Sequence, residues 1–495
     1  MSMKRRDFLQ HAGFSLGAAA LAGKAEFVQA DDKPQSSSPN EKLGFAIIGC
    51  GGRGGSHLDA FSSRKDTEVL YVCDVDAGHG ARAQKSAKDR QGTEPKFVQD
   101  FRKALEDPAV DCISTATPNH WHSLVSILAL QAGKHVYVEK PVSHNVWEGR
   151  QMVLWARHEN LMCQAGTQSR SSPSLHEAVK YVREGNLGKI QYAIGTCFKP
   201  RKSIGKLDKP LSIPDSIDYD LWCGPAAKVD LYRPKLHYDW HWDYNTGNGD
   251  MGNQGIHQMD IARWFLGEQT VSPRILSIGG RLGYDDAGDT ANTQVVVHDY
   301  EAAPLYFETR GLPKANLDWG TGMDNYRGSQ IGVIVQCEQG YVVIPSYSSA
   351  TAFDNDGKQV AKWGGGGDHF GNFVEGVRAN DHKVLNGDIL EGHLSSALCH
   401  TGGVSHVLGR KATVADVMQA LGDDKQLVDS VDRMCAHLLS NGVDVTKEAI
   451  LTLGADLKMN TSNESFIDNP TASPLLTRPY RDGFVVPSGE KLAKA

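Results

Sequence analysis

The sequence predicts an α/β protein with a doubly wound parallel sheet in its N-terminal domain and an open, mostly antiparallel sheet in its C-terminal α/β domain. Two observations predict this fold. Apolar runs of strand length alternate with helical patterns over residues 43–170, and the first run leads into a glycine-rich turn. Later apolar runs are separated by Gly or Asp/Asn clusters, which is typical of antiparallel strands. The length of 495 residues also favours two domains over one.

The glycine-rich turn predicts a dinucleotide site. The apolar run Phe45–Ile48 leads directly into GCGGRG at residues 49–54, and a helical pattern follows. Glycines allow a tight turn and let main-chain N–H groups approach a pyrophosphate, while the helix N-terminus adds positive partial charge. The expected pyrophosphate contacts are Gly49, Gly51, Gly52, Arg53 and Gly54.

An acidic residue after the second apolar run indicates which dinucleotide binds. The run Val69–Cys73 ends at Asp74, 20 residues after Gly54. A carboxylate in this place accepts both ribose hydroxyls of NAD and repels the 2′-phosphate of NADP. We therefore expect NAD, and NADP stays an alternative because Arg53 could neutralise that phosphate.

The later strands of the first domain are expected to end at the same edge of the sheet. Val110–Thr115 reads as a strand that breaks at a proline, and HVYV at 135–138 reads as the next strand. Ligands of such sheets lie outside the carboxyl ends of the strands. The residues expected to line the cofactor groove there are Thr117, Pro118, Asn119, His122, Glu139 and Lys140.

Four segments carry a family resemblance: EKP at 139–141, EAVKYVREGNLGKI at 177–190, YDLWCGPA at 219–226 and GDMGNQGIHQMDIARWFLG at 249–267. With them the chain resembles the glucose–fructose oxidoreductase, inositol dehydrogenase and rhizopine-catabolism (Gfo/Idh/MocA) family. The resemblance implies a Rossmann domain at 43–170 and a substrate and oligomerisation domain at 171–495. Members of the family typically oxidise or reduce a hydroxyl group of a sugar or cyclitol with NAD(P).

The resemblance implies catalytic roles for Lys140 and His257. Lys140 would bind the reacting hydroxyl and stabilise developing negative charge, and His257 would accept the proton. The family has an aspartate four residues before this histidine, where this chain has Asn253. The Asn253 amide can orient an imidazole but cannot stabilise an imidazolium by charge. Either His257 is therefore a weaker base here, or Asp250 or Asp260 supplies the charge. The alternatives are a lysine in a surface ion pair and a purely structural histidine.

Substrate contacts are expected from four residues. The resemblance places Gln168 and Arg170 near the sugar hydroxyls, and Asp260 follows His257 by one helical turn. HYDWHWDYN at 237–245 lies in a long proline-bearing connection and reads as a lid, in which Trp240 would stack on a sugar face. Plain packing is one alternative for this stretch, and a zinc or manganese site built from its imidazoles and carboxylates is the other. Its His and Asp residues match no metal motif, so we expect no metal.

The N-terminus resembles a twin-arginine export signal. KRRDFLQHAGFSLGAAALAG at 4–23 places two arginines before a short apolar run, and VQA at 28–30 suits a cleavage site. We therefore expect a signal peptide at 1–30, a polar linker at 31–42 and a periplasmic or otherwise exported protein. The apolar run is too short for stable membrane insertion. The alternatives are an ordinary Sec signal and a frayed amphipathic N-terminus.

Composition limits the partners. The net charge of −7 argues against nucleic-acid binding, and the nine cysteines form no CxxC pair. An open sheet with one exposed face favours a homo-oligomer, either a dimer or a tetramer. The expected ligand besides NAD is a small carbohydrate.

The predicted function is oxidation or reduction of a hydroxyl on a sugar, glycoside or cyclitol, with a tightly bound NAD(P) that is recycled in place. The twin-arginine route carries folded proteins, and a space outside the cytoplasm maintains no pool of free NAD. The protein would therefore be exported with its cofactor. The alternatives are a redox-neutral, NAD-dependent glycosidase or epimerase on the same fold, and a non-enzymatic carbohydrate-binding protein.

Overall fold

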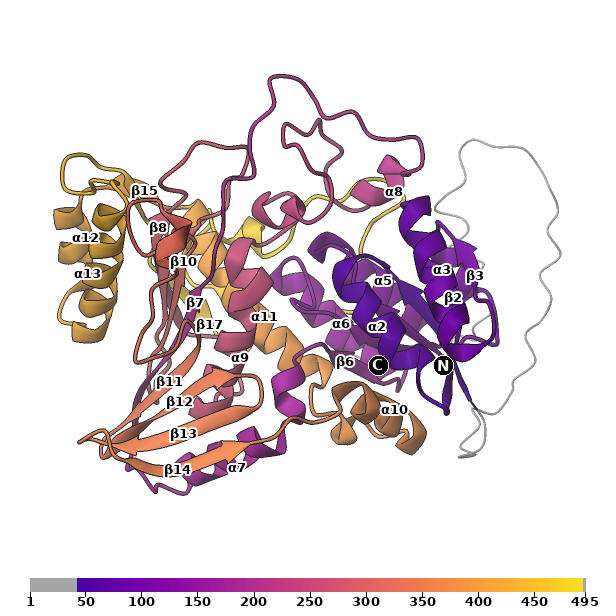
Figure 1. Cartoon of the computed structure of the whole chain (residues 1–495), viewed down its shortest axis with the longest axis horizontal. Coiled ribbons are helices and arrows are strands. Elements are labelled where there is room, and N and C mark those ends of the chain that lie inside the picture. Colours follow the sequence, from indigo (N-terminus) through magenta and orange to yellow (C-terminus); the bar gives the residue numbers. More distant parts are fainter. Residues whose placement is uncertain (1–41, 493–495) are drawn as a thin grey trace.

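The computed structural model of the protein describes residues 42–492, which contain two sheets with helices packed on them (Figure 1). The predicted signal peptide at 1–30, and all of the predicted linker except its last residue, lie outside the described residues. Export therefore stays a prediction. Within residues 42–492, no helix combines the length and the apolar character needed to cross a membrane.

The first sheet has six strands in the order β3-β2-β1-β4-β5-β6, and all neighbouring pairs are parallel. The strands are β1 (Leu43–Ile48), β2 (Thr67–Cys73), β3 (Lys96–Val98), β4 (Cys112–Thr115), β5 (His135–Val138) and β6 (Cys163–Ala165). The helices between them are α2 (Gly52–Ser62), α3 (Ala77–Gln91), α4 (Arg102–Leu105), α5 (Asn119–Gln131) and α6 (Val146–His158). This arrangement confirms the predicted doubly wound parallel sheet.

Both faces of this sheet are covered, which explains why its strands read as continuous apolar runs. Side chains of α2 and α3 pack on one face together with α10 (His369–Ala379), and α5 and α6 pack on the other. Helix α10 comes from a distant part of the sequence. The predicted domain boundary at residue 170 thus lies between the two sheets, but α10, which follows this boundary in the sequence, packs on the first sheet.

The second sheet is mixed and mostly antiparallel, with the main order β14-β13-β12-β11-β7-β10-β9-β8-β16-β15. Its one parallel pair among these strands joins β10 to β7. The strands are β7 (Ile190–Phe198), β8 (Arg274–Gly280), β9 (Thr293–His298), β10 (Leu305–Arg310), β11 (Ile331–Cys337), β12 (Gly340–Ser346), β13 (Ser349–Asp354), β14 (Gln359–Gly364), β15 (Arg410–Ala412), β16 (Leu451–Leu453), β17 (Leu457–Asn460) and β18 (Ser465–Phe466).

Within the described residues, helices pack on both faces of the second sheet, and on one face they pack on β7–β10, β15 and β16 but not on β11–β14. The helices α7 (Pro173–Arg183), α9 (Ile256–Leu266) and α11 (Ile389–Val407) share one apolar cluster with it. The helices α12 (Val414–Leu421) and α13 (Lys425–Ser440) share another on the opposite face. Helices α9 and α11 lie between the two sheets, whereas α7 lies beside β14, so α9 is held close to the edge of the first sheet (Figure 1).

Residues 199–249, here called the lid, connect β7 to the segment before α9 and contain the short helix α8 (Tyr219–Cys223). The lid has its own small apolar core and bonds to the first domain through its main chain. Asp218 N donates to Val75 O, Ala77 N donates to Ser216 O, and the Trp121 indole donates to Leu221 O. The lid therefore rests on the carboxyl-end edge of the parallel sheet.

Candidate active site

The glycine-rich turn has the backbone that a bound pyrophosphate requires. Gly49 has φ +79°, and a Cβ on Gly54 would lie 1.8 Å from Gly49 O, so only glycine fits in these places. Gly52 opens α2, and a Cβ there would meet no atom within 4 Å. The main chain of Gly51 and Gly52 is thus open at a helix N-terminus, which fits a dinucleotide phosphate.

Asp74 lies beside this turn, as predicted. Its Oδ2 accepts a hydrogen bond of 2.7 Å from Cys50 N, and its Oδ1 accepts one of 2.9 Å from Asp76 N. Two N–H donors fix the carboxylate at the carboxyl end of β2 and leave lone pairs for further donors. This oriented anion fits the ribose hydroxyls of NAD, and together with the open glycines it fits the cofactor.

The four predicted residues that follow β4 are Thr117, Pro118, Asn119 and His122. They form the turn into α5, with Pro118 at its N-cap. His122 is buried with its ring between the carbonyls of Pro141 and Thr117, at 2.6 and 2.8 Å, and Asn119 donates to Asn248 of the lid at 3.0 Å. These two side chains fix the loops around the groove. Their contact with the cofactor stays a prediction.

Glu139 is the centre of a buried charge network at the end of β5. It is 3% exposed. Its Oε1 is hydrogen-bonded to Arg53 Nε at 2.7 Å, to His57 Nε2 at 3.1 Å and to Gln168 Nε2 at 3.1 Å. Burial by itself would raise the pKa of Glu139, but Arg53 and His57 hold that pKa well below its ordinary value. Through Arg53 the carboxylate is bonded to the glycine-rich turn, and its negative charge lies next to Lys140.

Lys140 lies in the groove between the two domains and reaches the second one. Its Nζ donates to the main-chain O of Asn253. Asn253 belongs to a π-helical turn, Met251–Gly255, directly before α9. Burial lowers the pKa of Lys140; Glu139 opposes this effect and Arg53 reinforces it. π-turns are frequent at functional sites, and this one fixes the lysine against the helix that carries His257.

His257 is buried on α9 with 6% of its surface exposed. Its ring lies 4.7 Å from the ring of Tyr347, and neither of its nitrogens is hydrogen-bonded within residues 42–492. Burial, followed by the charge of Lys140, lowers the pKa of His257 well below its ordinary value. A neutral imidazole with free nitrogens is in the correct state to accept a proton.

The missing family aspartate is not replaced by the two expected carboxylates. Asp250 is bound by Arg201 at 2.6 and 2.9 Å, and Asp260 is bound by Arg170 at 2.9 Å. Both carboxylates are already paired with arginines. Among the charges that act on His257, the anion is Glu139, which raises the pKa of the imidazole against the larger effect of burial.

Arg170 and Asp260 lie in a buried network and not at the opening of the groove. They are 6% and 1% exposed. Asp260 also accepts from Ser395 Oγ at 2.6 Å, and Glu391 pairs with Arg170 and Arg263. Both residues therefore connect buried side chains of α9 and α11. The structure does not support the substrate contact predicted for them. Gln168, in contrast, lies beside Glu139 at the groove.

The lid contributes Trp240 and His241 near the site, and nothing in the sequence indicated a catalytic role for His241. Trp240 stacks on His241, with ring centroids 3.6 Å apart and an interplanar angle of 20°. The His241 Nδ1 contacts Tyr238 O at 2.5 Å. Burial and the nearby charge of Lys140 lower the pKa of His241 to about 3. No spacing in the sequence could identify His241, because only the fold of the lid brings it close to Lys140.

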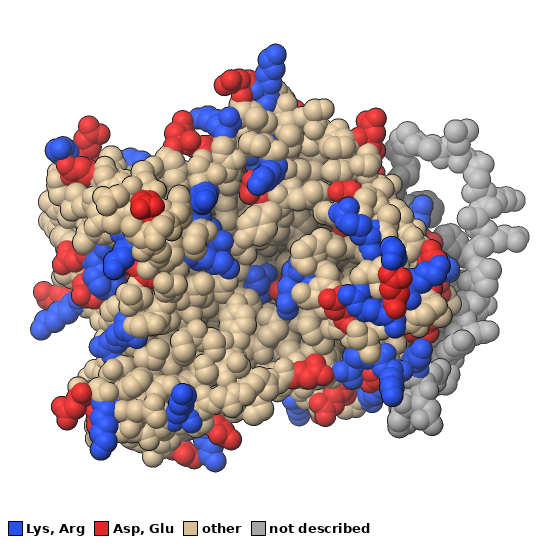
Figure 2. All heavy atoms as spheres, in the orientation of Figure 1, with Lys and Arg blue, Asp and Glu red and all other residues tan. Residues whose placement is uncertain are grey.

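Cations and amides complete the rim of the groove. Lys199 Nζ donates to Gln254 Oε1 at 3.2 Å, and Gln254 Nε2 donates to the Tyr347 hydroxyl at 2.8 Å. Figure 2 shows Lys and Arg side chains beside a hollow between the two domains. Hydroxyl groups of a ligand would find both donors and acceptors there.

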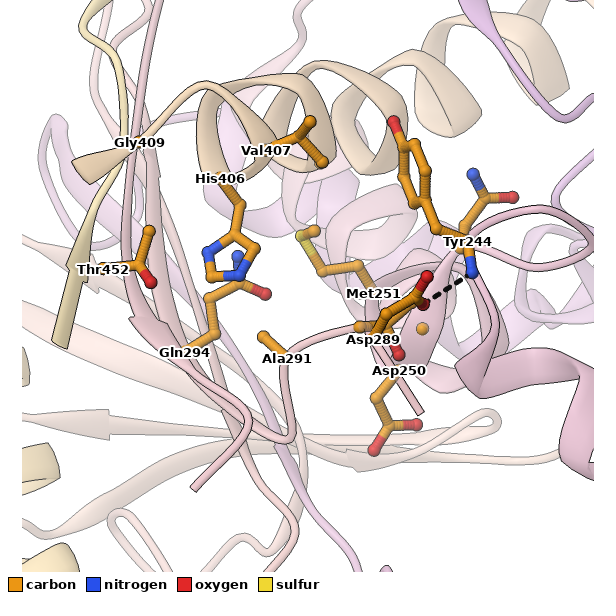
Figure 3. A pocket seen from close by; sticks show the side chains of 14 residues that line it. Tyr244, Asp250, Met251, Asp289, Ala291, Gln294, His406, Val407, Gly409 and Thr452 are labelled. Atoms are coloured by element: carbon orange, nitrogen blue, oxygen red, sulfur yellow. Dashed lines mark hydrogen bonds between the residues drawn. The ribbon is translucent and has the colours of Figure 1, made fainter. Parts of the chain in front are cut away.

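A separate cavity of about 400 Å³ lies beyond the π-turn (Figure 3). Tyr244, Asp289 and His406 point into it, and Tyr244 N donates to Asp289 Oδ1 at 2.7 Å. Asp250 and Met251 also line this cavity, but Lys140 and His257 do not. The predicted chemistry therefore belongs to the groove and not to this cavity.

Comparison with known proteins agrees with this architecture. Residues 43–167 match the family model described as "Oxidoreductase family, NAD-binding Rossmann fold", and residues 181–302 match the one described as "Oxidoreductase family, C-terminal alpha/beta domain". Together the two matched ranges cover about half of the chain.

Two curated relatives are similar over part of their length. A levoglucosan dehydrogenase of Pseudarthrobacter phenanthrenivorans is 26% identical over 242 residues, which are 48% of this chain and 54% of that protein. A glycosyl hydrolase family 109 protein of Saccharopolyspora erythraea is 30% identical over 160 residues, which are 32% of this chain and 35% of that protein. The chain thus spans about half the length, or less, of these relatives.

Solved structures show the same fold. A levoglucosan dehydrogenase in complex with NADH and levoglucosan matches with a TM-score of 0.52 and 18% identity, over 73% of this chain and 97% of that one. At this identity the likeness concerns the fold alone. The two matched models, the sheet topology and the glycine-rich turn lead to one conclusion: the chain belongs to the Gfo/Idh/MocA oxidoreductase family and carries its NAD-binding Rossmann domain.

Proposed function

We propose that the protein is an NAD-dependent oxidoreductase that acts on a hydroxyl-bearing carbon of a sugar, glycoside or cyclitol. One observation carries this proposal most strongly. The buried, neutral and unbonded His257 lies on the helix whose preceding π-turn anchors Lys140, at the carboxyl ends of the parallel strands. The levoglucosan dehydrogenase relative supports the substrate class.

The side chains divide the work as follows. Lys140 binds the oxygen of the reacting hydroxyl and stabilises the negative charge that develops on it. A ring nitrogen of His257 accepts the hydroxyl proton, since no other group competes for that nitrogen. When bound, NAD would supply the acceptor for the hydride that leaves the carbon bearing this hydroxyl. Asp74 and the open glycines hold the cofactor, and Gln168, Trp240 and the rim bind the rest of the carbohydrate.

The proposal includes cofactor retention and export. The lid bonds to the first domain beside Asp74, and two arginines of the C-terminal tail also hold the lid. Arg481 donates to the carbonyls of Asp220 and Gly224, and Arg478 donates to Tyr244 O. A covered cofactor leaves slowly, so a protein exported after folding would keep it and recycle it in place. A homo-oligomer remains part of the same proposal.

A second candidate is a redox-neutral NAD-dependent glycosidase. The specific observation in its favour is the similarity to the glycosyl hydrolase family 109 protein. In such a reaction, transient oxidation of a hydroxyl carbon acidifies the neighbouring C–H bond and permits elimination of the leaving group. The same His257 and Lys140 would serve both candidates, because both begin with removal of a hydroxyl proton.

The experiment uses the purified holoprotein and a panel of sugars, anhydrosugars, cyclitols and aryl glycosides. Reduction of the bound cofactor is followed by its absorbance and fluorescence, and leaving-group release is followed by chromatography. Cofactor reduction without cleavage supports the oxidoreductase, and cleavage without net reduction supports the glycosidase. The proposal is overturned if no member of the panel changes the cofactor or the ligand.

A further inference from the structure

Three side chains meet where the lid rests on the first domain. Asp76 and His79 lie at the start of α3, and His237 comes from the lid. Each offers one ligand atom, and these atoms lie within 4.8 Å of one another. Asp76 Oδ2 is 3.0 Å from His237 Nε2 and 3.9 Å from His79 Nε2. The three groups thus face a common point from two separate parts of the chain.

The surroundings orient these groups. Asp76 Oδ1 accepts from Gly78 N at 2.8 Å, which leaves Oδ2 to face the two imidazoles. Asp74 Oδ2 lies 3.6 Å from His79 Nδ1, on the side of the ring opposite the common point. A carboxylate behind an imidazole is the usual way to set the tautomer of a metal-binding histidine. The imidazole rings of His79 and His237 are 4.5 Å apart and tilted by 39°.

Solvent ions can reach this cluster. The side chains of Asp76, His79 and His237 are 15%, 20% and 40% exposed. None of the three takes part in the proposed oxidation of a hydroxyl. Two imidazoles and one carboxylate suit zinc and neighbouring transition metals, whereas magnesium and calcium prefer oxygen ligands alone.

We propose that Asp76, His79 and His237 bind one divalent transition-metal ion of the Zn²⁺ or Co²⁺ type, which fastens the lid to the first domain. Three protein ligands leave further coordination positions for water. The site is beside the cofactor groove, because a Cβ on Gly51 would lie 3.5 Å from His79 Cε1. The ion would therefore slow release of the cofactor, a consequence that rests on the proposed function, whereas metal binding itself does not.

The test uses Co²⁺, whose visible absorption reports ligand number, and Zn²⁺ in competition. Chelator-treated holoprotein is titrated with Co²⁺, and the bound metal is counted by mass spectrometry. The variants are His237→Ala and Asp76→Asn, the second of which keeps an N-cap acceptor for α3. The control is His158→Ala, which removes a 43% exposed histidine beside Glu159 on α6.

We expect one Co²⁺ per chain, displacement of it by Zn²⁺, and a metal-dependent rise in Tm. His237→Ala and Asp76→Asn should each weaken binding at least about 10-fold, as loss of a metal partner does elsewhere. His158→Ala should bind as the unchanged protein does. Equal binding by all four proteins, or no bound ion at all, overturns the proposal. Cofactor release is measured separately, so an inactive enzyme that still binds Co²⁺ contradicts only the proposed function.

Discussion

The side-chain amine of Lys140 donates a hydrogen bond to the main-chain carbonyl of Asn253, across the groove between the two domains. Lys140 directly precedes the cis proline Pro141 in the first domain, and Asn253 lies in the π-turn that leads into α9. A main-chain acceptor positions the lysine whatever side chain occupies residue 253. The chain can therefore have asparagine there and still anchor Lys140 to the turn before the helix that carries His257.

Replacement of Lys140 by alanine should lower kcat strongly. The amine is expected to stabilise charge that develops only during the reaction, and such groups contribute about 10²- to 10⁴-fold. The measurement is the rate of cofactor reduction with a substrate from the panel. Lys85→Ala is the matched control, because Lys85 is exposed on α3. A Lys140→Ala variant with an unchanged kcat would contradict the assigned role.

The acid limb of the pH profile of kcat/KM should lie below pH 6.5. Only the neutral imidazole accepts a proton, so activity falls as pH drops through the pKa of His257, which burial holds well below 6.5. The alkaline limb should lie below 10.5, because burial lowers the pKa of Lys140.

His257→Gln provides the control for the acid limb. This variant should lose most of its activity and should no longer show the acid limb in what activity remains. An acid limb at or above pH 6.5 in the unchanged protein would show that another group, or a charged His257, controls the reaction.

Asp260→Asn should destabilise the fold and leave KM nearly unchanged. The change removes one of the two carboxylates paired with the buried Arg170 and leaves Glu391 as the other, so we expect a cost of up to about 3–5 kcal/mol, the loss typical of a broken buried pair. Denaturant unfolding measures the free energy of unfolding, and initial rates measure KM. Asp356→Asn, at an exposed turn, is the control. A large rise in KM with unchanged stability would favour the substrate contact that the sequence predicted.

Arg481→Ala should speed the release of bound cofactor. Arg481 pairs with Asp220 and donates to two lid carbonyls, so its removal loosens the lid without touching the groove. Release is followed by rapid dilution and fluorescence of the reduced cofactor, with Arg410→Ala on the exposed strand β15 as the control. Identical release rates for both variants would show that the tail does not control the lid.

The first domain was predictable from sequence because its strands are local apolar runs and its turn needs glycine. Gly49 and Gly54 lie in the turn after β1, and Asp74 lies beside that turn at the end of β2, where their spacing placed them. The single parallel pair between β10 and β7 was not predictable, since pairing in a mixed sheet depends on contacts between distant segments. The return of α10 to the first domain was missed for the same reason.

The candidate site was predictable where a strand end positions the residue, as for Glu139 and Lys140. Prediction failed for side chains whose direction depends on tertiary packing. Arg170 and Asp260 face each other inside the protein. Lys140 meets the main-chain carbonyl of Asn253 in a π-turn that has no sequence signal. His241 reaches the site only because the lid folds over the groove.

The central claim is that this protein is an oxidoreductase that holds NAD tightly enough to work with it outside the cytoplasm. The most direct measurement is the nicotinamide content of protein purified from an exported fraction, desalted, denatured and assayed by chromatography. The account predicts close to one NAD or NADH per chain, with a redox state that changes when a substrate sugar is added before denaturation. An empty site that rebinds NAD only weakly would contradict the account.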